Sequence, residues 1–214
     1  KETDTQDITG TVLKECDPSE ITEETAKKCI ESFIGEYDQI PPMYSALKVN
    51  GKKLYELARE GKVVERKSRK VQIYDIRIKE MKLPRIRMEV SCSKGTYIRT
   101  LCNDVGEVLG VGGCMESLLR TKVSRFELKD SMKLADIEKA KNEGRTEEII
   151  LPLDEVFVEY PKIIVTGRQA QLAYNGNPFP KESAKNLILP GKDGGEDDLS
   201  DIFSRYKKYR VYDE

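Results

Sequence analysis

The feature that most restricts the fold of this chain is a strict alternation of apolar and polar residues near its middle. Residues 86, 88, 90 and 92 are apolar and residues 85, 87, 89 and 91 are polar, which predicts a strand with one face against a core. The preceding segment Val71–Ile78 is rich in β-branched residues, and a phase change between Ile73 and Tyr74 indicates a β-bulge. Because Pro84 lies in the short connection, the two strands are predicted to pair antiparallel.

Helices are predicted between antiparallel hairpins rather than in regular βαβ units. Thr22 can cap a helix that runs to about Ile34, and another helix is expected over about Tyr97–Leu109. Asn50-Gly51 is a strong signal for a tight two-residue hairpin turn. The predicted fold class is therefore α+β, built mainly on antiparallel sheet.

The chain is predicted to divide near Leu151–Tyr160, where Pro152 and Pro161 interrupt the pattern. We expect a core of residues 1–155 and a small second domain of residues 156–214. Inside the second domain, the glycine-rich and acidic segment Gly191–Asp201 is predicted to be mobile.

Composition excludes several classes of chemistry. The sequence has no histidine, and its five cysteines are widely spaced without a C-x-x-C pair, so zinc sites of the usual spacing and Ser-His-Asp or Cys-His nucleophile systems are not expected. No phosphate-binding loop of the G-x-x-x-x-G-K-[ST] type occurs. We expect no membrane span and a cytoplasmic protein with reduced cysteines.

Charge is distributed very unevenly along the chain. Residues 1–41 hold 4 basic and 11 acidic side chains, residues 42–125 hold 19 and 9, and residues 126–214 hold 14 and 18, giving net charges of −7, +10 and −4. A basic middle between acidic ends is typical of a protein that meets phosphate on one face. A chance run of charge on a solvated face would give the same pattern.

Three segments carry the candidate binding residues. Pro41–Gly61 interleaves tyrosines with cations on a predicted hairpin and short helix, a combination suited to phosphates and to bases exposed from a loop, although a surface hairpin around its own core explains it equally well. Cys92–Gly110 leads from a strand into a helix whose free N–H groups favour an anion. Glu116–Phe126 surrounds apolar positions with cations, and a hairpin packing its own core also fits.

Arg99 is the most informative residue of the second segment. It is predicted to lie in the first helical turn, where the helix dipole disfavours an unpartnered cation. This placement is explained either by a carboxylate or phosphate that arrives from elsewhere or by an internal structural ion pair. The residues alone do not decide between the two.

Four segments occur in an order and spacing that characterise one family: ETDTQDITG, PPMYSALKVNGKKLYELAREG, CSKGTYIRTLCNDVGEVLG and LLRTKVSRF. Through them the chain resembles the TruB-type tRNA pseudouridine synthases, closely over about residues 1–160 and loosely beyond. The resemblance implies an α+β pseudouridine synthase core followed by a small, truncated PUA-like C-terminal domain. It also implies isomerisation of a uridine in the T loop of tRNA (uridine-55), which is flipped out and re-attached through carbon without a cofactor or a metal.

The resemblance assigns roles to particular residues. Tyr97 and Arg99 match the family's Y-I-R motif, whose arginine pairs with the attacking aspartate, and Leu118 matches the leucine that packs against the target base. Residues 41–61 match the mobile thumb that grips RNA. We expect RNA contacts from these residues: Tyr44, Lys48, Lys52, Arg59, Lys94 and Arg120.

The sequence departs from the family at the nucleophile. No G-x-L-D motif occurs, and Leu153-Asp154 follows Pro152 in the wrong part of the chain. The family's uracil-stacking tyrosine, just upstream of T-D-T, would also precede Lys1. We therefore expect this chain to be an incomplete, inactive part of a synthase that binds the tRNA T arm, as a monomer. The alternative is a non-catalytic RNA-binding protein derived from that fold.

Overall fold

The computed structural model of the chain describes residues 1–180, 187–190 and 208–213. The chain folds into two compact units, Lys1–Arg125 and Phe126–Glu214. The division into residues 1–155 and 156–214 stays a prediction. The segment Gly191–Asp201 lies outside the described residues.

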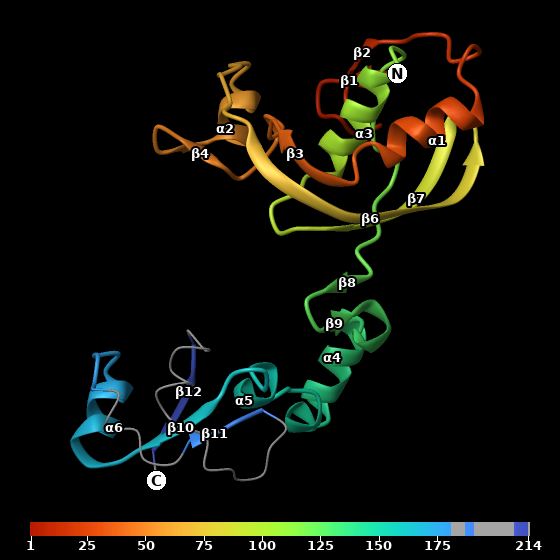
Figure 1. The fold of residues 1–214 in the computed structure, drawn as a ribbon. Helices are drawn as coiled ribbons and strands as arrows, with labels where there is room; N and C mark the ends of the chain where they lie inside the picture. Colours follow the sequence, from red (N-terminus) through yellow and green to blue (C-terminus); the bar gives the residue numbers. More distant parts are fainter. Residues whose placement is uncertain (181–186, 191–207, 214) are drawn as a thin grey trace. The chain divides into compact units, whose positions relative to one another are not determined.

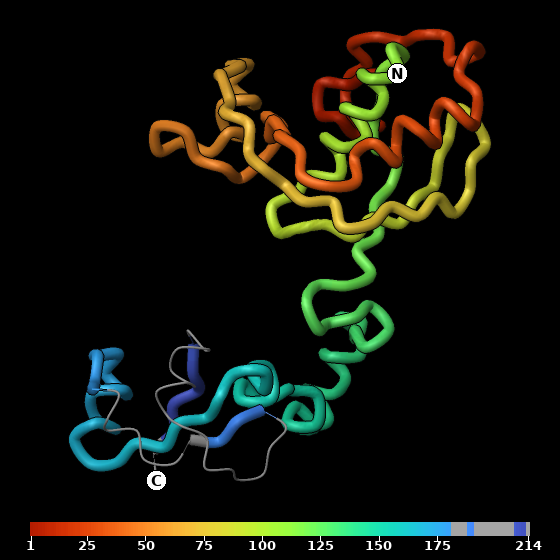
Figure 2. The backbone as a smooth tube through the Cα atoms, in the orientation of Figure 1, coloured from red at the N-terminus to blue at the C-terminus, as the bar shows by residue number. Residues whose placement is uncertain are grey.

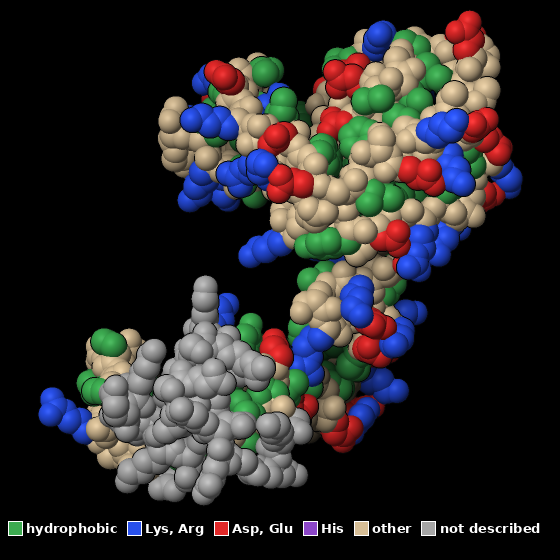
Figure 3. Space-filling model, viewed as in Figure 1, with side chains coloured by type: hydrophobic (Ala, Val, Ile, Leu, Met, Phe, Trp, Pro, Cys, Tyr) green, Lys and Arg blue, Asp and Glu red, His purple; other side chains and the backbone are tan. Residues whose placement is uncertain are grey.

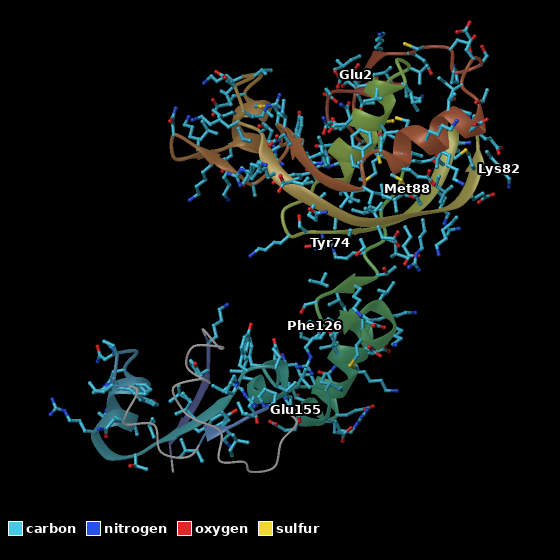
Figure 4. All side chains as sticks on the ribbon, in the orientation of Figure 1. Glu2, Tyr74, Lys82, Met88, Phe126 and Glu155 are labelled. Carbon is cyan, nitrogen blue, oxygen red and sulfur yellow. The ribbon has the colours of Figure 1, made fainter. Side chains whose placement is uncertain are left out.

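The first unit is built on a three-stranded antiparallel sheet with the order β3-β6-β7, formed by β3 (Gly35–Gln39), β6 (Arg69–Lys82) and β7 (Arg85–Cys92) (Figure 1). The antiparallel pairing of β6 and β7 confirms the prediction from their alternation. The bulge is confirmed as well, because the register shifts between Ile73 and Asp75. As a result Ile73 is fully buried, whereas Tyr74 is 60% exposed and points away from the helices (Figure 4).

Two helices, α1 (Glu23–Glu31) and α3 (Ile98–Val108), cover one face of this sheet (Figure 1). Their packing on the sheet forms the core of the unit, made by Ile30, Ile73, Ile76, Leu101 and Val105. These apolar side chains recur at helical spacing on α1 and α3, so burying them stabilises helices that would be marginal alone.

Helix α1 begins where the sequence predicts and ends earlier. The hydroxyl of Thr22 accepts a hydrogen bond from the backbone N–H of Thr25, and the Thr25 hydroxyl accepts one from the N–H of Thr22, a reciprocal cap. The predicted end at Ile34 is wrong, because the helix stops at Glu31. The chain must already be extended from Gly35 (φ +120°), which pairs with Ile73 of β6.

Residues 41–61 form a separate lobe of the first unit, which we call the thumb (Figure 2). Strands β4 (Lys48–Val49) and β5 (Lys52–Lys53) are joined by Asn50 and Gly51, both with positive φ, and helix α2 (Leu54–Arg59) follows directly. The predicted hairpin is thereby confirmed. The thumb has its own small core of Met43, Leu54 and Leu57.

The remaining elements are short. In the first unit, β1 (Glu2–Thr3) pairs with β2 (Val12–Lys14), and β8 (Lys122–Val123) lies near its end. The second unit contains these elements: β9 (Phe126–Glu127), η1 (Leu128–Asp130), α4 (Leu134–Asn142), η2 (Thr146–Glu148), α5 (Leu153–Val156), β10 (Lys162–Val165), α6 (Gly167–Tyr174), β11 (Leu187–Ile188) and β12 (Arg210–Asp213).

In the second unit, β10 pairs antiparallel with β11 and parallel with β12. The buried side chains of Ile163 and Val165 form its described core. Helices and largely antiparallel sheets together confirm the α+β class. Within the described ranges, every helix is too short or too polar to cross a membrane.

Candidate functional site

The site begins at the turn that leads from β7 into α3. The Thr96 hydroxyl donates to the Ser93 carbonyl at 2.9 Å, and Gly95 has φ +89°, a backbone region that favours glycine. The Ser93 hydroxyl also accepts the backbone N–H of Gln72 at 3.0 Å, which ties the turn to β6. The start of α3 is therefore held firmly by the sheet.

The first turn of α3 carries no negative charge of its own. Tyr97 is the N-terminal capping residue but makes no capping hydrogen bond through its side chain, and no acidic residue follows in the first turn. Lys94 is exposed just before it. Unsatisfied N–H groups and a nearby cation together favour an anionic partner at this helix start.

The backbone of Tyr97 is held by Gln39, the last residue of β3. The Gln39 carboxamide oxygen accepts the Tyr97 N–H at 2.8 Å, and its nitrogen donates to the Tyr97 carbonyl at 3.1 Å. The same nitrogen donates to the Tyr37 hydroxyl. Burial, with a further contribution from the Asp104 charge, raises the pKa of Tyr37 to about 12, so this phenol is neutral at any physiological pH.

Arg99, in the first turn of α3, is half-buried and turns toward the thumb. Its Nη2 donates to the backbone carbonyl of Tyr44 at 2.9 Å. Among the described residues it forms no ion pair with a carboxylate within 4.0 Å. The sequence left two explanations open for the position of Arg99. The described residues do not show one of them, the internal structural ion pair.

Asp7 is a charged neighbour of Arg99 that is not among the predicted site residues. Hydrogen bonds from the hydroxyl and the backbone N–H of Thr9, at 2.7 and 3.1 Å, lower the pKa of the Asp7 carboxyl, and the charge of Arg99 lowers this pKa further. Asp7 belongs to the quoted segment ETDTQDITG. The spacing of residues in the sequence does not indicate that Asp7 lies near Arg99, because only the tertiary fold brings the two close.

Hydrogen bonds connect the segment around Asp7 to α3 and to Met115. The N–H of Ile8 donates to the Met115 carbonyl at 2.9 Å, and the N–H of Met115 donates to the Gln6 carbonyl at 3.0 Å. The buried hydroxyl of Thr100 donates to the Gln6 carboxamide at 2.7 Å. These bonds bring the N-terminal segment, α3 and the start of Glu116–Phe126 into one place.

The thumb presents its cations outward. Lys48, Lys52 and Arg59 are exposed, and basic side chains gather on the thumb and the adjoining part of β6 (Figure 3). The ring of Tyr55 is approached by the Lys53 ammonium, 5.4 Å from its centroid, and by the Arg59 guanidinium at 5.3 Å. Such cation–π interactions order two long side chains without neutralising their charge.

The other candidate residues lie as follows. Tyr44 is half-buried against the thumb core, so its side chain contributes to packing. Leu118 is 54% exposed, and Arg120 is exposed two residues later. In the described parts of the chain neither forms a hydrogen bond or ion pair with Arg99, so the structure brings together Tyr97, Arg99 and the base of the thumb.

A shallow hollow lies elsewhere, between α1 and β6. It has a volume of about 570 Å³ and is lined by acidic residues of α1, including Glu23, Glu24 and Glu31, and by Ile76 and Ile78. Its negative charge does not suit a phosphate ligand. In the described residues, no cluster of three or more acidic or cysteine side chains could hold a metal ion.

Comparisons with known proteins agree on one family. Residues 1–98 match the family described as TruB family pseudouridylate synthase (N terminal domain), and residues 99–158 match tRNA pseudouridylate synthase B C-terminal domain. The tRNA pseudouridine synthase B of Lachnoclostridium phytofermentans is 49% identical over 72% of this chain and 53% of its own length. That of Clostridium tetani is 47% identical over 81% of this chain and 59% of its own length.

Solved structures show the same fold. A Cbf5-Nop10-Gar1 complex contains a chain that is 25% identical, with a TM-score of 0.59 over 79% of this chain and 49% of that chain. An archaeal box H/ACA sRNP Nop10-Cbf5 complex gives 24% identity and a TM-score of 0.55 over 78% of this chain and 47% of that one. The chain thus spans between about half and three-fifths of the length of these relatives.

Proposed function

This chain belongs to the TruB family of pseudouridylate synthases, and we propose that it forms the RNA-gripping and active-site-supporting part of a tRNA pseudouridine synthase. The substrate we propose is the uridine at position 55 in the T loop of tRNA. The relatives at 47–49% identity carry the name tRNA pseudouridine synthase B. That name supports the reaction class, and the +10 charge of residues 42–125 supports a nucleic-acid partner.

The observation that carries the proposal is the direct attachment of the thumb to the start of α3. The bond between Arg99 and the Tyr44 carbonyl holds a half-buried guanidinium at the base of a cationic hairpin. An RNA loop gripped by the thumb would therefore deliver a flipped base close to Tyr97 and Arg99. Cations that bind phosphate position the RNA, while the helix start receives the nucleoside.

We assign separate roles to the residues of this site. Arg99 pairs with the attacking aspartate and keeps that carboxylate ionised, since a nearby opposite charge favours the charged form. Tyr97 and Leu118 enclose the flipped base. The exposed cations of the thumb, together with Lys94 and Arg120, bind phosphate.

The aspartate itself is proposed to come from a G-x-L-D-P segment, a motif that these 214 residues do not contain. Asp7 lies in ETDTQDITG rather than in such a motif, and its Oδ1 accepts two hydrogen bonds from Thr9. We therefore propose that the chain by itself converts no uridine.

We further propose that the protein acts without a cofactor, as a monomer in the cytoplasm, and binds the T arm of tRNA. Residues 156–214 are proposed to form a small PUA-like domain after a synthase core of residues 1–155. The strand and helix pattern of β10, α6 and β12 supports a separate small module.

The proposal is tested with two proteins: this chain, and the chain joined behind a TruB-type N-terminal segment that carries G-x-L-D-P, here called the extended chain. Both are incubated with unmodified tRNA, and pseudouridine is mapped. We expect conversion at position 55 by the extended chain only. Tight T-arm binding without conversion by the extended chain would favour the non-catalytic RNA-binding alternative, and turnover by this chain alone would show that the nucleophile lies within it.

A further inference from the structure

The side chain of Gln39 is almost completely buried, with 1% exposed, and all its hydrogen-bonding groups have partners. Its nitrogen donates to the Tyr97 carbonyl and to the Tyr37 hydroxyl, and its oxygen accepts the Tyr97 N–H. A carboxamide has two donor hydrogens and one acceptor oxygen. Burial of a polar group is costly unless it is satisfied in this way.

The two bonds to Tyr97 reproduce what a neighbouring strand would offer to that residue. Tyr97 has an extended backbone (φ −97°, ψ 106°), and its carbonyl also accepts the first bond of α3 from the Leu101 N–H at 3.0 Å. A residue held at both its N–H and its C=O cannot rotate about φ or ψ without breaking a bond. The direction in which the helix starts is thereby fixed.

Gln39 also lies at a junction in the fold. It ends β3, opposite Arg69 of β6, and the thumb begins two residues later at Pro41. The carbonyl of Pro41 is held by the guanidinium of Arg66 at 3.0 Å. Gln39, which holds the start of α3, is therefore anchored to the sheet on one side and adjoins the fixed base of the thumb on the other.

We propose that Gln39 is a positioning residue for uridine isomerisation: its carboxamide fixes the backbone of Tyr97 and so aims the side chains of Tyr97 and Arg99 at the reacting nucleoside. The effect on catalysis rests on the proposed function, whereas the hydrogen bonds from Gln39 to Tyr97 do not depend on it. Holding reacting groups in the productive geometry contributes strongly to rate, and a small displacement costs about 10²-fold.

Two substitutions separate the donor from the acceptor. Gln39→Glu keeps the shape and the acceptor, but its ionised carboxylate faces the Tyr97 carbonyl without a hydrogen to donate. Gln39→Leu removes both bonds. The matched control is Gln169→Glu on α6, because Gln169 is a half-buried glutamine whose side chain makes no hydrogen bond with the described residues.

The first measurement is amide hydrogen exchange on the chain itself. We expect exchange at the Tyr97 N–H and the first turn of α3 to accelerate roughly tenfold in Gln39→Leu, in line with the loss of a buried hydrogen bond. In Gln39→Glu, acidification protonates the introduced carboxyl and restores its donor, so protection of this turn should recover at low pH. Tyr37, the titratable side chain that the carboxamide touches, stays neutral throughout. Asp104 of α3, whose charge acts on Tyr37, also gains a proton at low pH, so the parent is acidified in parallel and the recovery must exceed any change in the parent.

The second measurement is single-turnover conversion and tRNA affinity in the extended chain. We expect the rate to fall by about 10–100-fold in both Gln39 variants with affinity nearly unchanged, and to rise again for Gln39→Glu as pH falls. Gln169→Glu should match the parent. The proposal would be overturned by any of three results. These are unchanged exchange at the Tyr97 N–H, a uniform loss of protection across the unit, and faster exchange at Tyr97 without a loss of rate. An inactive parent would instead count against the proposed function, while the exchange data would still decide whether Gln39 holds the helix.

Discussion

The guanidinium of Arg99 donates a hydrogen bond of 2.9 Å to the backbone carbonyl of Tyr44, across 55 residues of sequence. This bond joins the first turn of α3 to the base of the thumb. A carbonyl is a weaker partner for a guanidinium than a carboxylate, because a charge-assisted pair is stronger and can form two bonds. A carboxylate that approaches Arg99 would therefore compete well with Tyr44.

Replacing Arg99 should affect the reaction far more than RNA binding. In the extended chain, Arg99→Ala leaves the attacking aspartate without its partner; its pKa rises and its attack weakens. Arg99→Lys should also be poor, since an ammonium cannot reproduce the planar two-point interaction. We expect most of the single-turnover rate to be lost while tRNA affinity stays close to that of the parent.

The control for Arg99 is Arg77→Ala, which removes an exposed arginine of β6 that pairs with Asp75 at 2.7 Å. Its rate should equal that of the parent. Near-normal rates for Arg99→Ala, or a defect confined to affinity, would move Arg99 to a phosphate-binding or structural role.

The cations of the thumb should set the salt dependence of RNA binding. Neutralising phosphates releases counterions, so affinity falls linearly with salt on a logarithmic scale. Replacing Lys48, Lys52 and Arg59 together with Ala should flatten that slope by about one unit for each phosphate that is no longer neutralised. Affinity for T-loop RNA is measured by titration at several salt concentrations.

A matched triple variant removes the same charge from a different surface. Arg77, Lys79 and Lys82 are exposed on β6, and each lies in an ion pair with a neighbouring acid. Replacing these three with Ala should leave the slope nearly unchanged. Equal slopes for both triple variants would mean that RNA binding depends on net charge and that the thumb has no special part.

Local patterns predicted local structure well in this chain. The alternation before Cys92, the phase change after Ile73 and the Asn50-Gly51 turn can each be recognised from a few consecutive residues, and the structure confirms all three. The end of α1 was mispredicted because the pairing of Gly35 with Ile73, a distant residue, decides it.

The candidate site was only partly predictable for the same reason. Arg99 could be singled out because a cation in a first helical turn is locally unfavourable. Asp7 and Gln39 could not, since their partners Arg99 and Tyr97 are far away in the sequence. Neither residue type nor spacing distinguishes these two from ordinary surface residues.

Gly106 should be essential for the packing of α3 against the loop that leads to Leu118. A Cβ at Gly106 would lie 2.1 Å from the backbone nitrogen of Gly113, and backbone cannot move aside as a flexible side chain does. Gly106→Ala should therefore destabilise the fold by about 1–3 kcal/mol or more, although alanine favours helix. Urea unfolding measures this, with Val108→Ala as the control because Val108 is 66% exposed on the same helix. A stabilised Gly106→Ala variant would contradict the close approach.

Asp104 should make the protein less stable at neutral pH than a variant with an uncharged side chain at this position. Burial raises the pKa of this half-buried carboxyl of α3, helped by the charge of Glu107 and opposed by a hydrogen bond from Asn103. A raised folded-state pKa means that the fold disfavours the ionised form. Stability is then lost as pH rises from about 3.8, the ordinary value, through the folded pKa. Asp104→Asn removes the charge and should avoid this loss.

We therefore expect Asp104→Asn to raise the unfolding midpoint in urea at pH 7, with the gain shrinking as pH falls toward 3.8. Spectrophotometric titration gives a second measurement, because the Asp104 charge helps to hold the pKa of Tyr37 at about 12. That pKa should fall in the variant while staying above 10, the ordinary value, since burial is its main cause. Glu107→Gln, an exposed change on the same helix, should shift both quantities less. A lower midpoint for Asp104→Asn at pH 7 would mean that the carboxylate has a stabilising partner in the fold that outweighs its burial.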